Sequence, residues 1–317
     1  MNRPLLIALL SLAAAAHAQS WPAKPLHAIV PVGAGSSTDI VHRIVLERLS
    51  KALGQPIVLE NRTGAGGTIG SAVVAKAKPD GYTLLAYGAA HTIAPALYKS
   101  LPYDPARDLL PVVPVGSSPS VLAVSPAKGL RTPQALVAAA KASPGRLNFS
   151  SVGIGTATHL SAERFAASAR IEVVHVPFKG GAEAMTEVIA GRIDFFFGPV
   201  ALVLPHIRDG ELLALAVNSA ERSRALPDVP TLRQAGYVDA EYPIWFGLFA
   251  PAGTPRAIVE KLNRETLKVL QTPEVRDKLS SLGVDPMAMT VDQFKRYVDG
   301  QFALNASLAE KAGLTAQ

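Results

Sequence analysis

Short apolar runs alternate along this chain with stretches in which apolar residues recur every three or four positions. The first apolar run, Leu26–Val30, predicts a buried strand. Small residues follow it, and Val41, Ile44, Val45 and Leu49 then share the spacing of one helix face. We therefore expect a strand, a tight turn and a helix N-terminus at the start of the fold.

The same alternation continues through most of the chain. Further strands are predicted at residues 56–59, 82–87, 147–150, 173–178, 193–197 and 212–217, and helices at 68–76, 133–142, 159–167, 182–189, 255–270, 273–282 and 291–312. Strands that alternate with helices predict an α/β fold with parallel sheets covered on both faces. In such folds the ligand site lies at the carboxyl ends of the strands.

Two proline-rich passages interrupt the alternation. Residues 101–126 are interpreted as a connection that leaves the first domain, and residues 226–230 lead to the apolar run 242–251, a candidate return strand. The chain is therefore expected to pass between two domains twice, near residues 120–124 and 242–249. Two such connections predict two lobes with a cleft between them that closes by a hinge. We expect one lobe from residues 19–121 plus 245–317 and the other from residues 122–244.

The N-terminus has the three parts of a secretory signal. Arg3 is followed by an apolar stretch, Leu5–Ala16, that is too short to span a bilayer, and Ala16-His17-Ala18 fits an A-x-A cleavage site. Cleavage after Ala18 is expected, which predicts an exported, periplasmic protein with residues 1–18 removed. An uncleaved anchor helix is the alternative.

Composition narrows the class of protein. The 317 residues are 49% hydrophobic and 18% charged, which suits a globular chain long enough for two domains. The absence of cysteine excludes disulfides, thiolate metal sites and a cysteine nucleophile. The net charge of +6 is scattered, and no basic run interleaved with aromatic residues predicts nucleic-acid binding.

The turn after the first strand, residues 30–39, has the features of an anion site. Its small residues let a ligand approach the backbone, and the first N–H groups of the following helix point outward at the positive end of the helix dipole. The candidate ligand-binding residues here are Gly33, Ala34, Gly35, Ser36, Ser37 and Asp39. A dinucleotide fingerprint is a weaker alternative, because Thr38 replaces its third glycine and Glu60 lies too far along.

A second turn, residues 150–159, repeats this chemistry in the other predicted lobe. Its candidate residues are Ser151, Gly153, Gly155, Thr156, Thr158 and His159, and Gly88, Ala89 and Lys179 are added from two further strand ends. We expect the Thr156 hydroxyl to donate a hydrogen bond to the anion. Neither loop contains Lys or Arg, so backbone amides and hydroxyls are expected to balance the charge.

Residues arranged for catalysis are sparse. There is no Gly-x-Ser-x-Gly nucleophile elbow. His159 and Glu163 are one helical turn apart, but no third metal ligand is evident, and His91 and Asp39 are expected to organise loops. We expect no catalytic residue, no metal and no cofactor, and a secreted enzyme remains the alternative from another functional class.

Together these stretches resemble the Bug family, the extracytoplasmic solute receptors associated with tripartite tricarboxylate transporters. The resemblance covers essentially the whole mature chain. It rests on Ile29-Val30-Pro31 with Thr38-Asp39, on Glu60-Asn61-Arg62-x-Gly64-Ala65-Gly66-Gly67-x-Ile69-Gly70, on Pro79-Asp80-Gly81-Tyr82-Thr83-Leu84-Leu85, on Tyr103-Asp104-Pro105, on Val176-Pro177-Phe178-Lys179-Gly180, on Leu226-Pro227-Asp228-Val229-Pro230-Thr231 and on Trp245-x-Gly247-Leu248-Phe249-Ala250-Pro251-Ala252-Gly253-Thr254-Pro255.

The resemblance implies a two-lobed venus-flytrap receptor of the type II periplasmic-binding-protein fold. It implies that the two loops, residues 32–39 and 150–159, hold a small organic carboxylate, which is often a dicarboxylate in this family. Residues 33–36 depart from the proline-rich, double-glycine turn usual in the family, so the ligand is not inherited with the fold. Delivery to a membrane transporter and signalling to a membrane sensor both fit, and a monomer is expected.

Overall fold

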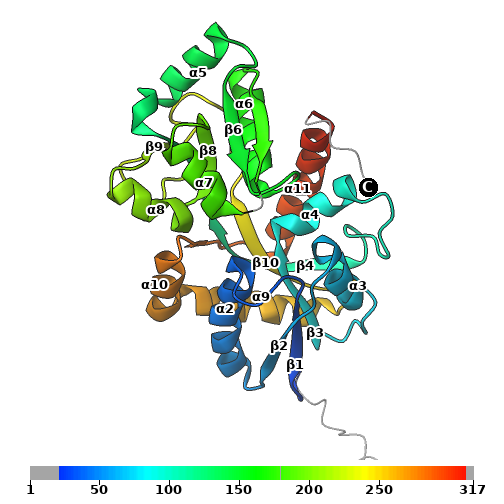
Figure 1. Cartoon of the computed structure of the whole chain (residues 1–317). Helices are drawn as coiled ribbons and strands as arrows, with labels where there is room; N and C mark the ends of the chain where they lie inside the picture. Colours follow the sequence, from blue (N-terminus) through cyan, green and yellow to red (C-terminus); the bar gives the residue numbers. More distant parts are fainter. Residues whose placement is uncertain (1–20, 179, 312–317) are drawn as a thin grey trace, which may run out of the picture.

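In the computed structural model, which describes residues 21–178 and 180–311, the chain forms two sheets with helices packed against them (Figure 1). The α/β fold class expected from the sequence is confirmed. The predicted signal peptide, residues 1–18, lies outside the described residues, as does Lys179. Within the described part of the chain, no helix is both long enough and apolar enough to cross a membrane.

The first sheet has six strands and occupies the lower half of Figure 1. From edge to edge these are β11 (Asp285–Pro286), β4 (Leu109–Ser118), β10 (Ile244–Pro251), β3 (Thr83–Gly88), β1 (Leu26–Val30) and β2 (Ile57–Asn61). β1, β2 and β3 are parallel, and β10 is antiparallel to both of its neighbours. The helices of this half are α2 (Ser37–Leu53), α3 (Thr68–Ala75), α4 (Ala89–Leu97), α9 (Arg256–Gln271), α10 (Pro273–Ser281) and α11 (Val291–Lys311), with a 3-10 turn, η1 (Ala65–Gly67), before α3.

The second sheet has five strands and lies above the first (Figure 1). From edge to edge these are β7 (Val174–Pro177), β6 (Asn148–Ser151), β8 (Phe195–Pro199), β5 (Ser120–Val124) and β9 (Leu213–Val217). β6 is parallel to β7 and β8, whereas β5 is antiparallel to β8 and β9. Its helices are α5 (Pro133–Ala142), α6 (Ala157–Ala169), α7 (Gly181–Ile189) and α8 (Val200–Arg208), with a 3-10 turn, η2 (Pro126–Lys128).

The strand predictions are confirmed to within two residues at each end, including β10 as the return strand. The chain passes from the first sheet to the second within residues 101–126, as expected, but most of this passage is not a loop, because β4 lies inside the first sheet. Its prolines argue against a strand in the sequence, because proline has no N–H group to donate within a sheet. Proline is nevertheless tolerated at β-bulges. The pairing of β4 with β10 shifts register next to Pro111 and again next to Pro114.

Two further elements were not predicted. Helix α4 is short and contains Pro95, and β11 has only two residues. Neither gives a clear periodic signal in the sequence. Helix α4 matters most, because it contributes one wall of the cleft described below.

The buried side chains of the first sheet form two layers, one on each face. Leu26, Ala28 and Val30 of β1 pack with α2 and α9, whereas Ile29 packs on the opposite face with Tyr87. This alternation follows from the strand geometry, in which successive side chains point to opposite faces. The sheet is therefore covered on both sides, and its strand ends are left as the place for a site.

The outgoing crossing between the two sheets is short, and polar contacts hold both crossings. Only Pro119 separates β4 from β5. The Asn218 side chain accepts a hydrogen bond from the Ser120 N–H group at 2.7 Å and donates one to the Tyr242 carbonyl at 2.6 Å. The Tyr242 hydroxyl in turn donates to Asn305 of α11 at 2.5 Å. One buried network therefore ties together the outgoing and returning crossings.

Candidate ligand-binding cleft

A cavity of about 560 Å³ lies where the two sheets face each other. On the side of the first sheet its walls are the segments that follow β1, β2 and β3, together with one face of α4. On the other side are residues 154–157, the loop between β6 and α6, and the return crossing contributes Tyr242, Trp245 and its neighbours. The position at strand carboxyl ends agrees with the expectation from the alternating pattern.

The loop after β1 folds around one buried carboxylate. The Gly35 N–H group donates to Asp39 Oδ2 at 2.9 Å, and Ser36 caps α2 by accepting from the Asp39 N–H group at 3.3 Å. Gly35 has a φ of 80°, which favours glycine at this position. The loop is thus fixed by hydrogen bonds between residues four and three apart.

Asp39 is only 2% exposed, and its carboxylate accepts hydrogen bonds from three other residues of the protein. Besides Gly35, the donors are Arg43 Nε at 3.0 Å and Asn61 Nδ2 at 2.9 Å. Burial alone raises the pKa of this carboxyl, but the bonds from Arg43, Gly35 and Asn61 outweigh burial and lower the pKa to about 2. Asp39 is therefore ionised at neutral pH and serves as the anchor of the first loop.

The loop after β6 folds in the same way around an imidazole. The Gly155 N–H group donates to His159 Nδ1 at 3.1 Å, and Gly155 has a φ of 74°. Because Nδ1 accepts, the proton of the neutral ring is on Nε2, which lies 3.5 Å from Glu163 Oε1. The His159 ring also stacks on His175, with centroids 3.8 Å apart.

His175 connects this stack to the loop. Its Nε2 lies 2.6 Å from the Ser151 hydroxyl oxygen, which also accepts from the Gly153 N–H group at 3.1 Å. Burial, together with the neighbouring His159, lowers the pKa of His175 to about 4. His175 is therefore neutral at physiological pH, and the stack carries no charge from this ring.

The two loops correspond position by position. In each, a glycine N–H group bonds the side chain four residues later, and the residue after that glycine is the helix N-cap in an extended conformation. The matched pairs are Gly33 and Gly153, Gly35 and Gly155, Ser36 and Thr156, and Asp39 and His159. Each loop thus presents the N-terminus of a long helix, whose first amides have no carbonyl partner within the helix. Two such helix ends on one cavity are suited to an anion.

The predicted site residues divide into two groups. Five of them line the cavity: Gly33, Gly88, Ala89, Gly155 and Thr156. The others that the structure describes belong to the same loops but do not line the cavity: Ala34, Gly35, Ser36, Ser37, Asp39, Ser151, Gly153, Thr158 and His159. Several of them bond within their own loop, and the Thr158 hydroxyl accepts from the Val152 N–H group at 3.0 Å.

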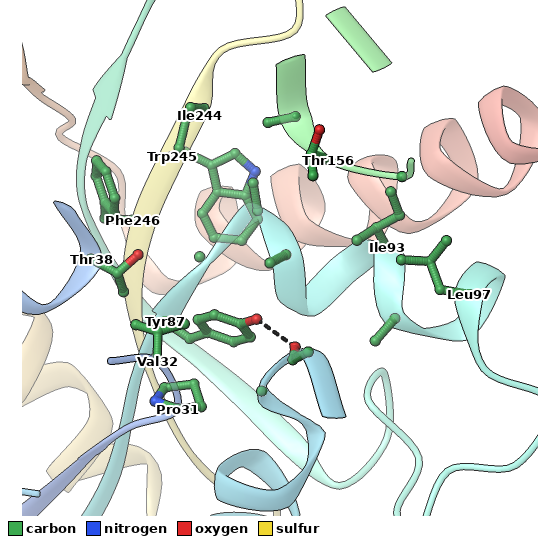
Figure 2. Close-up of a pocket in the computed structure, with 18 of the residues that line it drawn as sticks. Pro31, Val32, Thr38, Tyr87, Ile93, Leu97, Thr156, Ile244, Trp245 and Phe246 are labelled. Carbon is green, nitrogen blue, oxygen red and sulfur yellow. Dashed lines mark hydrogen bonds between the residues drawn. The ribbon is translucent and has the colours of Figure 1, made fainter. Parts of the chain in front are cut away.

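The structure gives the Thr156 hydroxyl a different partner from the one expected. Thr156 Oγ1 donates to the Gly153 carbonyl at 2.7 Å, so its single proton is used within the loop. The residue contributes to the cleft wall, as Figure 2 shows, but its hydroxyl is not a free donor in this arrangement. The backbone amides of the two helix ends are left as the main donors.

Sequence reasoning missed the aromatic and glycine-rich parts of the wall. Tyr87, Trp245 and Phe246 line the cleft, and the Tyr87 hydroxyl donates to the Gly66 carbonyl at 2.8 Å (Figure 2). A Cβ at Gly67 would lie 2.6 Å from the Tyr87 hydroxyl oxygen, so the approach of this ring requires glycine there. The stretch Gly64-Ala65-Gly66-Gly67 is part of a motif that the sequence shares with the family, but the sequence alone does not assign it to the site.

The described walls of the cleft carry no charged side chain. Among the described residues that line it there is no Lys, Arg, His, Asp or Glu. The part of the chain that the structure describes contains no group of three or more His, Cys, Asp or Glu residues that could hold a metal ion. The arrangement can bind and orient an anion through backbone amides.

A model of the family described as "Tripartite tricarboxylate transporter family receptor" matches residues 41–314. Protein BugT of Bordetella pertussis is 36% identical over 311 residues, which covers 98% of this chain and 95% of BugT.

Two solved structures are similar along almost their whole length. One is a Rhodopseudomonas palustris protein with adipate, which is 30% identical with a TM-score of 0.76 and covers 94% of this chain and 100% of that one. The other is MatC from Rhodopseudomonas palustris with bound malate, which is 30% identical with a TM-score of 0.71 and covers 91% of this chain and 100% of MatC.

Proposed function

Because the chain belongs to the tripartite tricarboxylate transporter receptor family, we propose that it captures a small organic carboxylate in the cleft and delivers it to a membrane transporter of that type. The observation that carries this proposal is the matched pair of loops, each of which places a helix N-terminus on one uncharged cavity. An anion held between them gains hydrogen bonds from amides fixed in advance by Asp39 and His159.

The carboxylate of the ligand contacts the backbone at Gly33 and Gly155 and the first amides of α2 and α6. Gly88 and Ala89, at the start of α4, complete the wall on the side of the first sheet. Asp39 and His159 act as positioning residues because each bonds a loop glycine four residues before it. Lys179 adds only to the surrounding positive field.

Support for the carboxylate comes from two similar proteins. The Rhodopseudomonas palustris relatives have adipate and malate bound, which are both small carboxylates. Extending that chemistry to this chain is consistent with the absence of cationic side chains in its described cleft lining, since helix ends and amides suffice for one carboxylate at close range.

Closure of the two lobes, residues 19–121 plus 245–317 and residues 122–244, buries the ligand. The receptor works as a monomer in the periplasm after removal of residues 1–18. Mass spectrometry of the protein recovered from a periplasmic fraction tests the export proposal, which expects a mature chain that begins at Gln19. A chain that retains residues 1–18 in the membrane fraction refutes it.

The binding proposal is tested by native mass spectrometry and thermal unfolding. Matched pairs are compared, each a carboxylate with its uncharged amide, for example benzoate with benzamide and adipate with adipamide. A ligand that binds only the folded protein adds about 2.7 kcal/mol at 100 times its dissociation constant, so a true ligand raises the melting temperature visibly. Stabilisation by sugars with silence across all carboxylates overturns the proposal.

A further inference from the structure

One side of the cleft is lined by aliphatic side chains. Ile93, Ala94 and Leu97 of α4 line the cavity and are spaced so that they share a face of the helix. Figure 2 shows Ile93 and Leu97 on the opposite side of the view from Thr38 and Phe246, with the indole ring of Trp245 between them. We call Ile93, Ala94, Leu97, Ile154 and Trp245 the apolar wall.

Ile154 is the exposed member of this wall. It lies at the tip of the second loop, is 65% exposed and lines the cleft. The matching position in the first loop is Ala34, so only the second loop carries a large apolar side chain at its tip. A ligand that covers this side chain removes apolar surface from water, which lowers the free energy of the complex.

Three of the six Tyr and Thr hydroxyl groups in the described lining donate within the protein. The Tyr87 hydroxyl donates to Gly66, the Tyr242 hydroxyl donates to Asn305, and the Thr156 hydroxyl donates to Gly153. No carboxylate is present in the described lining to pair with an ammonium group. Amino or hydroxyl groups of a ligand that lie against Ile93, Ala94, Leu97 and Ile154 would lose hydrogen bonds to water without replacement.

We propose that this receptor selects carboxylates whose body is apolar, an aromatic ring or a branched or cyclic aliphatic group, over hydroxy acids and amino acids. The inference rests on the proposed function and specifies its substrate class. The two helix N-termini hold the carboxylate, and the ring or aliphatic body lies against the apolar wall. A cavity of about 560 Å³ has room for such a ligand.

Calorimetric titration of the full mature chain with four probes tests the selection. Benzoate and cyclohexanecarboxylate represent apolar bodies, and malate and aspartate represent polar ones. We expect the first two to bind about 10-fold to 100-fold more tightly, because covering apolar surface contributes about 25 cal/mol per Å². Their binding should also show the negative heat-capacity change that marks apolar burial.

A pair of variants locates the effect. Ile154→Thr keeps the β-branch but makes the loop tip polar, and we expect it to weaken benzoate binding by about 5-fold to 10-fold and to reduce the heat-capacity change. Val174→Thr is the matched control, because Val174 is also exposed, at 46%, but lies on β7 outside the cleft lining. It should leave benzoate binding unchanged.

The outcomes separate the two proposals. If malate or aspartate binds as tightly as benzoate, or if Ile154→Thr binds benzoate as well as the control does, the substrate class is wrong while a carboxylate receptor stands. If no carboxylate in the wider panel binds, the proposed function fails as well. Tight benzoate binding that depends on Ile154 supports both.

Discussion

Replacing Asp39 with asparagine removes the charge that anchors the first loop while keeping the size of the side chain. In the native protein the two carboxylate oxygens accept from Gly35, Arg43 and Asn61. Asparagine has one acceptor oxygen and one NH₂ group, so at least one of these donors faces another donor. Leaving a buried donor without an acceptor costs about 1–3 kcal/mol.

The pKa of Asp39 gives a second estimate of how much this carboxylate stabilises the folded protein. A shift from the ordinary value of 3.8 to about 2 corresponds to about 2 kcal/mol of stability, since a tenfold change in proton affinity is worth about 1.4 kcal/mol. The folded-state pKa is the lower one, so this stabilisation is complete at neutral pH and is lost as the pH falls through 2. The Arg43 side chain is 46% exposed, so solvent screens its ion pair with Asp39, and this pair contributes little of the stabilisation.

Urea unfolding at pH 7 and pH 3 measures both effects. At pH 7 we expect Asp39→Asn to lower the free energy of unfolding by about 2–3 kcal/mol. At pH 3 the native protein has lost roughly half of the stability that it owes to the lowered pKa of Asp39, so the difference between the variant and the native protein should shrink by that amount. Asp292→Asn is the control, because Asp292 pairs with Arg256 where both side chains are more than half exposed, at 62% and 55%. Its loss should be much smaller. A difference for Asp39→Asn that is negligible at pH 7, or no smaller at pH 3, refutes the anchoring role.

Further predictions concern the second loop and the aromatic wall. His159→Phe should weaken carboxylate binding by roughly 5-fold to 50-fold in calorimetry, because the Gly155 N–H group loses its acceptor. His175 has a pKa lowered to about 4, so its stabilising contribution is complete above about pH 6.5 and declines toward pH 4; the stability of the native protein relative to His175→Phe should fall over that window in urea titrations. Ligand should change the fluorescence of Trp245, which lines the cleft, and this change should survive Trp21→Phe but vanish in Trp245→Phe.

The sequence predicted the strands and both loops because their signals are local. An apolar run followed by glycine and small hydroxyl residues marks a strand end at Gly33 and again at Gly153. The direction of the polar side chains in those loops is not a local property. The Asp39 and His159 side chains accept hydrogen bonds from Gly35 and Gly155 of their own loops, and only the folded structure shows that they fix the loop backbone instead of lining the cleft.

The wall of the cleft could not be predicted because its parts meet only in the tertiary structure. Residues 89–97 are small, include Pro95 and lack a capping side chain, so α4 gives a weak helix signal. Its contact with the second loop is close, since a Cβ at Gly155 would lie 2.8 Å from Leu97. β4 was not predicted because its prolines are typical of a loop, whereas in the structure bulges accommodate them within the strand.

The one-residue crossing at Pro119 has a consequence for the integrity of the molecule. Since β4 runs into β5 with no loop between them, a protease finds no slack, accessible strand of chain there to thread into its active site. Proteolytic cleavage between β4 and β5 is therefore less favourable than cleavage of a long linker between two lobes. The shortness of this crossing thus protects the covalent link between the two halves of the molecule.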